Sequence, residues 1–181
     1  MDFFERSFSK ESLLKGELLL IDKPMKWSSF QVVNKIRWHL KNKTGLKKLK
    51  VGHAGTLDPL ATGLLLICTG KKTKSIETYQ KQEKEYVGKL FLGATTLSYD
   101  LETSRDYSYS TEHITHQHIL DMSKKFTGEI EQYPPLFSAL KKEGKRLYKY
   151  AREGLKPEIK PRRVLISEFK IEKIKLPEIE F

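Results

Sequence analysis

The sequence has little of the material from which secreted or membrane proteins are built. Cys68 is the single cysteine among 181 residues, so no disulfide can form within the chain. No apolar run approaches the ~20 residues of a membrane span, and Met1–Arg6 does not resemble a signal peptide. We therefore expect a cytoplasmic protein without a membrane partner. The apolar residues at 64–67 indicate a buried strand, which leaves the thiol of Cys68 no chemical role.

Two common kinds of functional site are also lacking. The Gly-Lys pair at 70–71 suggests a phosphate-binding loop, but that motif needs a glycine at position 65, which is a leucine. His113, His116 and His118 lie close together in the sequence, yet no cysteine or His-Glu pair at ligand spacing accompanies them. The sequence therefore disfavours nucleotide hydrolysis and predicts no metal site. We interpret the three histidines as solvated side chains.

Acidic residues are too few to balance the basic ones. Lysine and arginine number 34 against 23 aspartates and glutamates, which gives a net charge of +11. A surplus of that size attracts polyanions, and nucleic acid is the class of partner that fits best. A basic surface that serves solubility alone is the alternative that composition leaves open.

The basic residues gather in two parts of the sequence. One group brackets residues 52–63 and comprises Lys41, Lys43, Lys47, Lys48, Lys50, Lys71, Lys72 and Lys74. The other comprises Lys141, Lys142, Lys145, Arg146, Lys149 and Arg152, with Tyr148 and Tyr150 among them. Basic side chains contact phosphates and aromatic rings stack on bases. We expect both groups to contact RNA, through residues that include Lys47, Lys48, Lys141 and Arg152.

Residues 52–63 read Gly-His-Ala-Gly-Thr-Leu-Asp-Pro-Leu-Ala-Thr-Gly and contain one carboxylate, Asp58. The small residues suit neither an ordinary helix nor a strand, and they leave room for a large group to approach the backbone. Pro59 disfavours the α region for Asp58 and has no N–H, so the carboxylate is presented in an extended turn. This composition is typical of an active-site loop, although Asp-Pro before a tight bend is also a common turn.

The same segment carries a resemblance to a known family. Residues 52–65 resemble the signature of the bacterial tRNA pseudouridine(55) synthases, whose catalytic aspartate falls on Asp58. The related archaeal and eukaryotic RNA-guided synthases share the aspartate motif. Residues 60–63, Leu-Ala-Thr-Gly, resemble the bacterial form.

Three further blocks match the family in the same order. Residues 20–24, Leu-Ile-Asp-Lys-Pro, followed by Ser28-Ser29, resemble its N-terminal Lys-Pro motif. Residues 84–86, Lys-Glu-Tyr, resemble the strand that carries its active-site tyrosine. Residues 133–141 resemble its Pro-Pro-x-Phe-Ser-Ala-x-Lys block, together with Gly144, Tyr148, Ala151 and Arg152.

The resemblance implies an α/β (α+β) catalytic domain with the pseudouridine synthase fold, a mixed and largely antiparallel sheet flanked by helices. It implies isomerisation of the T-loop uridine of tRNA to pseudouridine: the carbon–nitrogen glycosidic bond breaks, and a bond from C5 to C1′ forms. No electron, phosphate or group is exchanged, so no cofactor is expected. Asp58 would be the nucleophile, and its attack on C1′, its attack on C6 and removal of a sugar proton all stay open.

The resemblance also implies roles around the aspartate. A stacked target uridine must be extruded to reach Asp58. Tyr86 would stack on the flipped uracil and assist removal of the C5 proton, His53 would contact the displaced nucleotide or its neighbours, and Lys23 would support the loop. The expected substrate-binding residues near the loop are Lys23, His53, Gly55 and Thr56. The expected partner is the T-stem-loop of tRNA, bound by a monomer.

One departure from the family concerns its C-terminal part. Family members continue through a Gly-Thr-Tyr-Ile-Arg motif, whose arginine pairs with the catalytic aspartate, and often into a small RNA-binding domain. Neither is present in the 181 residues. We therefore expect residues 1–181 to form the catalytic domain without its C-terminal part, and to turn over poorly. The alternative function is a non-catalytic tRNA-binding or folding factor, or an inactive truncated synthase, with no need of Asp58.

Local patterns predict alternating strands and helices. Strands are expected at Glu17–Asp22, Gly63–Thr69, Lys84–Leu92 and Val164–Leu176, and residues 177–181 are expected to end without a closing turn. Helices are expected from Ser28 or Ser29 to about Lys41, near Thr73–Gln80, and at Thr115–Phe126 and Arg146–Glu153. The side chains expected on the buried helix faces are Val33, Ile36, Leu40, Ile119, Met122 and Phe126.

Overall fold

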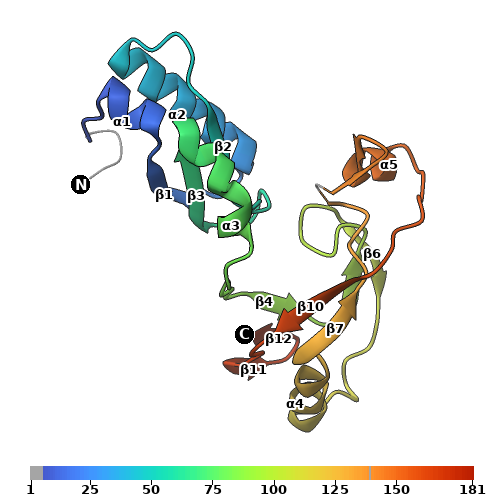
Figure 1. The fold of residues 1–181 in the computed structure, drawn as a ribbon. Helices are drawn as coiled ribbons and strands as arrows, with labels where there is room; N and C mark the ends of the chain where they lie inside the picture. The colour runs from blue at the N-terminus through green and yellow to red at the C-terminus, as the bar shows by residue number, and fades with distance from the viewer. Residues whose placement is uncertain (1–5, 139) are drawn as a thin grey trace. The chain divides into compact units, whose positions relative to one another are not determined.

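The structure is a computed structural model that describes residues 6–138 and 140–181 (Figure 1). Residues 1–5 lie outside this range; they are part of the Met1–Arg6 segment that does not resemble a signal peptide. Ala139, in the block at 133–141, also lies outside it. The chain divides into two compact units, residues 1–84 and residues 85–181. The single catalytic domain expected over the whole chain stays a prediction, and each unit is described by itself.

The first unit contains an antiparallel sheet in the strand order β1-β3-β2. Its strands are β1 (Leu18–Lys23), β2 (Val51–His53) and β3 (Gly63–Thr69). Leu19 of β1 lies opposite Ile67 of β3, and both side chains are buried, as the alternation of side chains along a strand requires. The two strands expected at residues 17–22 and 63–69 are thus confirmed.

Helix α2 (Ser29–Thr44) covers this sheet with one apolar face. Ser28 caps its N-terminus in a capping box with Gln31, and Gly45 ends it in the left-handed conformation with φ 69°. Val33, Ile36 and Leu40 are buried as expected and belong to the same core cluster as Leu19, Leu65 and Ile67. Burial of each such side chain contributes roughly 1.5–3 kcal/mol. The helix continues one turn past the expected end.

Short helices flank the sheet strands in the sequence. They are α1 (Lys10–Lys15), which precedes β1, and the 3-10 helix η2 (Gly70–Ser75) and α3 (Ile76–Gln80), which follow β3. Thr69, fully buried, donates from Oγ1 to the carbonyl of Leu13 at 3.0 Å and accepts from the amide of Glu17 at 2.9 Å. Gly70 has φ 50°, and a Cβ there would lie 2.3 Å from the carbonyl of Leu13. Only glycine allows this approach of α1 to the end of β3.

The second unit consists of short antiparallel ribbons and two helices. Its three-stranded sheet has the order β11 (Lys173–Lys175), β12 (Glu178–Glu180) and β4 (Lys89–Phe91). The two-stranded pairs are β7 (Gly128–Gln132) with β10 (Arg162–Ile166), β5 (Ala94–Thr96) with β6 (Arg105–Ser108), and β8 (Lys141–Lys142) with β9 (Lys145–Arg146). The helices are α4 (His116–Lys125) and α5 (Leu147–Arg152). The expected α/β class is confirmed, with small antiparallel sheets in place of one larger mixed sheet.

Three local expectations for the second unit are wrong. Only residues 89–91 of the strand expected at 84–92 form a strand. The strand expected at 164–176 is two strands, β10 and β11, which pair with different partners. The tail does make a closing turn at residues 176–177, after which β12 pairs with both β11 and β4. In each case a strand exists only where a neighbour supplies its backbone hydrogen bonds.

Helix α4 forms where the apolar spacing predicts it, but fewer of its side chains are buried than the spacing predicts. Ile119 is buried, whereas Met122 is 47% and Phe126 48% exposed. Phe126 still contacts the ring of Phe169 edge-on, with centroids 6.3 Å apart, and Phe169 contacts Phe181 in the same way. Among the described residues no helix is both long enough and apolar enough to cross a membrane.

Candidate active-site loop

The aspartate loop connects β2 to β3 in the first unit. Asp58 is exposed, and its carbonyl accepts the amide of Ala61 at 3.0 Å, which closes a turn at Pro59 and Leu60. Gly55 has φ 121° with no heavy atom within 4 Å of a Cβ placed there. Glycine is therefore needed at position 55 for its backbone conformation rather than for space. The loop presents its one carboxylate to solvent, as its composition predicts.

Ser29, the first residue of α2, holds the loop one residue before the aspartate. Its hydroxyl accepts the amide of Leu57 at 2.9 Å and donates to the carbonyl of the same residue at 3.0 Å. Ser29 is 2% exposed. Sequence reasoning saw Ser28-Ser29 as part of a motif and as a helix cap, but missed this contact. The sequence did contain a sign of it. Ser28 already caps the helix, so the hydroxyl of Ser29 is available for another partner.

Lys23, the last residue of β1, lies beneath the same loop with no exposed surface. Its ammonium donates to the carbonyls of Trp27 at 2.6 Å, Pro24 at 3.0 Å and Pro59 at 3.4 Å. The amide of Lys26 also donates to Pro59, at 2.7 Å. Lys23 therefore contacts the loop backbone, and in this structure it offers no surface to RNA.

The charge of Lys23 is set by two opposing effects. Burial lowers the pKa of its ammonium below the ordinary value of 10.5, because a low-dielectric site disfavours the charged form. The negative charge of Asp58 acts in the opposite direction and favours the ammonium. The buried ammonium of Lys23 and the exposed carboxylate of Asp58 are thus coupled electrostatically.

The remaining loop residues predicted for the site lie on either side of Gly55. His53, half-buried at the end of β2, makes a hydrogen bond through Nδ1 to the carbonyl of Gly55. This bond fixes the imidazole against the loop. Thr56 is exposed. The structure therefore brings His53, Gly55, Thr56 and Asp58 together in one loop, while their contacts with a substrate stay predictions.

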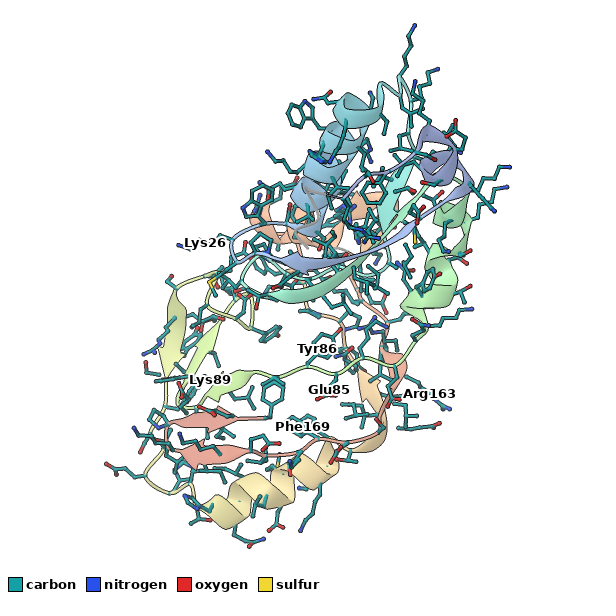
Figure 2. All side chains as sticks on the ribbon, turned by 90° about the vertical axis from the view of Figure 1, so that its left-hand side faces the viewer. Lys26, Glu85, Tyr86, Lys89, Arg163 and Phe169 are labelled. Carbon is teal, nitrogen blue, oxygen red and sulfur yellow. The ribbon has the colours of Figure 1, made fainter. Side chains whose placement is uncertain are left out.

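Tyr86 belongs to the second unit, in the extended segment that leads into β4. Figure 2 shows it next to Glu85 and ahead of Lys89. Its side chain is 62% exposed, and no strand includes it. Two residues later, Gly88 and Phe181 exchange both backbone hydrogen bonds, at 2.9 and 3.0 Å. The segment is therefore anchored just beyond Tyr86, and the joint action of Tyr86 and Asp58 stays a prediction.

The predicted RNA-contacting residues also fall in both units. Lys47 and Lys48 are exposed in the connection between α2 and β2. In the second unit, Lys141 is exposed in β8, and the guanidinium of Arg152 lies 5.4 Å from the ring centroid of Tyr148. The ammonium of Lys145 lies 4.7 Å from the ring of Tyr150 and pairs with Glu153. The interleaved aromatic and basic residues thus form cation–π pairs.

Asp58 is the one carboxylate in the loop at residues 52–63. Within residues 6–138 and 140–181, no three histidine, cysteine, aspartate or glutamate side chains come close enough together to hold a metal ion. His116 and His118 lie in the first turn of α4, where His118 takes part in a capping box with Thr115. An exposed carboxylate on an anchored backbone can act as a nucleophile or as a base.

Comparison with known proteins shows the family of this chain. A protein-family model described as TruB family pseudouridylate synthase (N terminal domain) matches residues 41–181. A protein of Flavobacterium johnsoniae named tRNA pseudouridine synthase B is 60% identical over 172 residues, which cover 94% of this chain and 75% of that protein. Proteins of the same name from Phocaeicola vulgatus and Chlorobium chlorochromatii are 55% and 42% identical, over 92% and 98% of this chain and 71% and 69% of their own length. The chain belongs to the TruB family of pseudouridylate synthases.

Proposed function

We propose that this chain is a catalytic part of a tRNA pseudouridine synthase that acts on the T-loop uridine. The observation that carries the proposal is Asp58, exposed on a loop that Ser29 and Lys23 hold in place, in a chain up to 60% identical to proteins named tRNA pseudouridine synthase B. Two anchors on one short loop keep the carboxylate where a substrate can meet it, and such positioning is a large part of enzymatic rate enhancement.

The reaction leaves the chemical formula of the nucleotide unchanged. The bond between N1 and C1′ breaks, the uracil turns in place, and a bond forms between C5 and C1′. The proton on C5 is lost to water, and N1 takes up a proton in its place. Asp58 takes part either by attacking C1′ or C6, or by removing a sugar proton. No redox or group-transfer cofactor is required.

The target uridine must leave its base stack before Asp58 can reach it. Extrusion costs a few kcal/mol, which contacts in the site offset. Tyr86 stacks on the extruded uracil and assists loss of the C5 proton. Its 62% exposure supports this role, because most of the residue is accessible to a ligand rather than packed against the protein. His53, with its imidazole fixed on Gly55, contacts the displaced nucleotide or a neighbour.

The basic groups supply most of the affinity for the T-stem-loop. Lys47, Lys48, Lys141 and Arg152 contact phosphates, which is consistent with the net charge of +11. The protein acts as a monomer in the cytoplasm, where tRNA is processed.

The test is tritium release from [5-³H]uridine-labelled tRNA, because formation of the C5–C1′ bond displaces the C5 hydrogen. We expect release that depends on Asp58 and retained tRNA binding after Asp58→Asn. Binding without any release by this chain or by a longer one would favour the non-catalytic folding factor. Such a protein needs the basic surface but not the aspartate.

A further inference from the structure

The outer face of α2 carries a stripe of side chains that the catalytic loop does not use. Phe30, Asn34, Trp38 and Lys41 follow one another at spacings of four, four and three residues, which places them on one side of a helix. This side is opposite the buried Val32, Val33, Ile36 and Leu40. Phe30 is 63% and Trp38 60% exposed. Two large rings in line on a helix surface indicate a contact surface.

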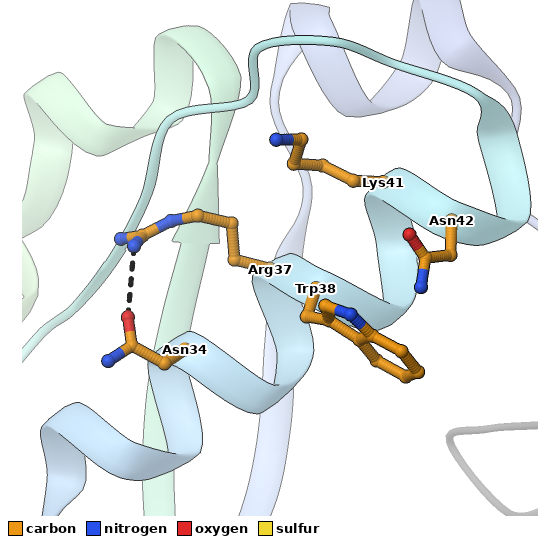
Figure 3. Close-up of a pocket in the computed structure, with 5 residues that line it drawn as sticks. All are labelled: Asn34, Arg37, Trp38, Lys41 and Asn42. Carbon is orange, nitrogen blue, oxygen red and sulfur yellow. Dashed lines mark hydrogen bonds between the residues drawn. The ribbon is translucent and has the colours of Figure 1, made fainter.

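A shallow hollow of ≈ 230 Å³ lies on this stripe. Its lining residues are Asn34, Arg37, Trp38, Lys41 and Asn42 (Figure 3). In Figure 3, Trp38 and Asn42 lie on one flank of the helix, and Arg37 and Lys41 on the other. Pockets for small molecules typically measure 300–1,000 Å³ and enclose their ligand. A smaller hollow on a single helix suits one flat ring that lies against Trp38.

The polar groups around the hollow are partly fixed and partly available. Arg37 donates to Asn34 Oδ1 at 3.0 Å and to the carbonyl of Val51 at 2.9 Å, which holds both side chains in place. The ammonium of Lys35 lies 5.4 Å from the ring centroid of Trp38. The side chains of Lys41 and Asn42 have no hydrogen-bond partner among the described residues. The hollow therefore combines an aromatic ring, Lys41 and amide groups, with Lys35 beside the ring of Trp38.

The charge around this face has one sign. Residues 23–57 contain no aspartate or glutamate. They contain nine basic residues: Lys23, Lys26, Lys35, Arg37, Lys41, Lys43, Lys47, Lys48 and Lys50. An unbroken positive segment attracts a polyanion, and it repels a second copy of the same basic surface. Charge complementarity thus favours RNA as the occupant of the stripe.

We propose that the outer face of α2 binds an RNA nucleotide other than the reacting uridine. Its base stacks on Trp38, its flanking phosphates contact Lys35 and Lys41, and the amides of Asn34 and Asn42 face the base edge. Trp38 lies nine residues along the helix from Ser29, which holds the aspartate loop, and this corresponds to about 14 Å. The two sites therefore take different nucleotides. The inference rests on the proposed function in that the RNA is the tRNA substrate.

The experiment uses the fluorescence of Trp38 in a Trp27→Phe protein, which leaves a single indole. We expect unmodified tRNA to quench this emission in a saturable way, because a stacked base lies directly on the indole. Trp38→Leu should weaken tRNA binding at least about fivefold, whereas Trp38→Phe should retain most of it. Because Trp38 is mostly exposed, the melting temperature should stay nearly unchanged in both variants.

The salt dependence of binding supplies a second readout. Lys41→Ala should lower the slope of log K against log salt by about 0.7–0.9, the value of one phosphate contact. Lys15→Ala, which removes the same charge from an exposed position in α1, is the matched control and should leave the slope unchanged.

Three outcomes would overturn the inference: Trp38 emission that stays constant while tRNA saturates the protein, equal affinity after Trp38→Leu, or emission that depends on protein concentration without RNA. The last would show that a second copy covers the face. Tritium release, measured on the same samples, separates this inference from the proposed function. Quenching without release counts against catalysis, and release without quenching counts against the α2 site.

Discussion

The hydroxyl of Ser29 holds the backbone of Leu57 through both its amide and its carbonyl, at 2.9 and 3.0 Å. The two residues are 28 positions apart, and Asp58 follows Leu57 directly. The first turn of α2 is therefore hydrogen-bonded directly to the aspartate loop. Ser29 is 2% exposed, and its hydroxyl acts as both donor and acceptor, which leaves the backbone of Leu57 little freedom.

The first prediction concerns the carboxylate itself. Asp58→Asn should abolish tritium release while tRNA binding stays within about twofold, because an amide cannot act as nucleophile or base and affinity resides mainly in phosphate contacts. Asp22→Asn removes another exposed carboxylate, from β1, and serves as the control, with normal release expected. Near-normal release by the Asp58→Asn protein would refute the catalytic assignment.

The second prediction separates loop anchoring from helix capping. Ser29→Ala leaves the backbone of Leu57 without its partner, which should cost about 1–3 kcal/mol of stability and lower turnover at least about tenfold through misplacement of Asp58. Ser28→Ala removes the helix cap instead, at a similar cost of about 0.5–2 kcal/mol. Tritium release at temperatures where both variants are folded should fall only for Ser29→Ala. Equal losses for both variants would show that Ser29 affects stability alone.

The third prediction concerns the pH dependence that Lys23 introduces. Burial lowers the pKa of Lys23 in the folded protein, so the unfolded chain binds the proton more tightly. Below the folded pKa both states are protonated and the fold bears the full cost of the buried charge. As pH rises through the folded pKa toward 10.5, this cost disappears and stability contributed by Lys23 increases.

Lys23→Met removes this titration together with the hydrogen bonds to three carbonyls. We expect the variant to be less stable than the original protein, and the difference in unfolding free energy to grow as pH rises toward 10.5. Denaturant unfolding of both proteins across the alkaline range measures the difference, in which contributions from other lysines cancel. A difference that stays constant or shrinks with pH would mean that folding does not lower the pKa of Lys23.

The fourth prediction concerns the basic connection between α2 and β2. Replacement of Lys47, Lys48 and Lys50 by alanine should weaken binding to all RNAs tested. It should also lower the salt slope by about 0.7–0.9 for each RNA phosphate that these three side chains neutralise. Replacement of Lys170, Lys173 and Lys175 removes the same charge from the second unit and is the matched control. If both triple variants change the slope equally, net charge rather than a defined binding surface determines affinity.

Much of the first unit follows from local sequence. The strand at 63–69, the helix that begins at Ser29 and its buried face of Val33, Ile36 and Leu40 are read correctly because alternation and helical spacing repeat over several residues. The second unit is less predictable. Its strands are two to five residues long, and β4 and β10 exist only where β12 and β7, far away in the sequence, pair with them. The patterns at 84–92 and 164–176 therefore overstate strand length.

The sequence by itself determined the chemistry of the candidate site. Glycine, alanine and proline around Asp58 act through steric limits on one or two dihedral angles, so the exposed turn can be read from residues 52–63 alone. Only the tertiary structure decided what holds that turn. The bond from Ser29 to Leu57 and the burial of Lys23 beneath Pro59 join residues 28 and 36 positions apart. A lysine is ordinarily exposed, and it becomes a buried anchor only where packing brings backbone carbonyls to its ammonium.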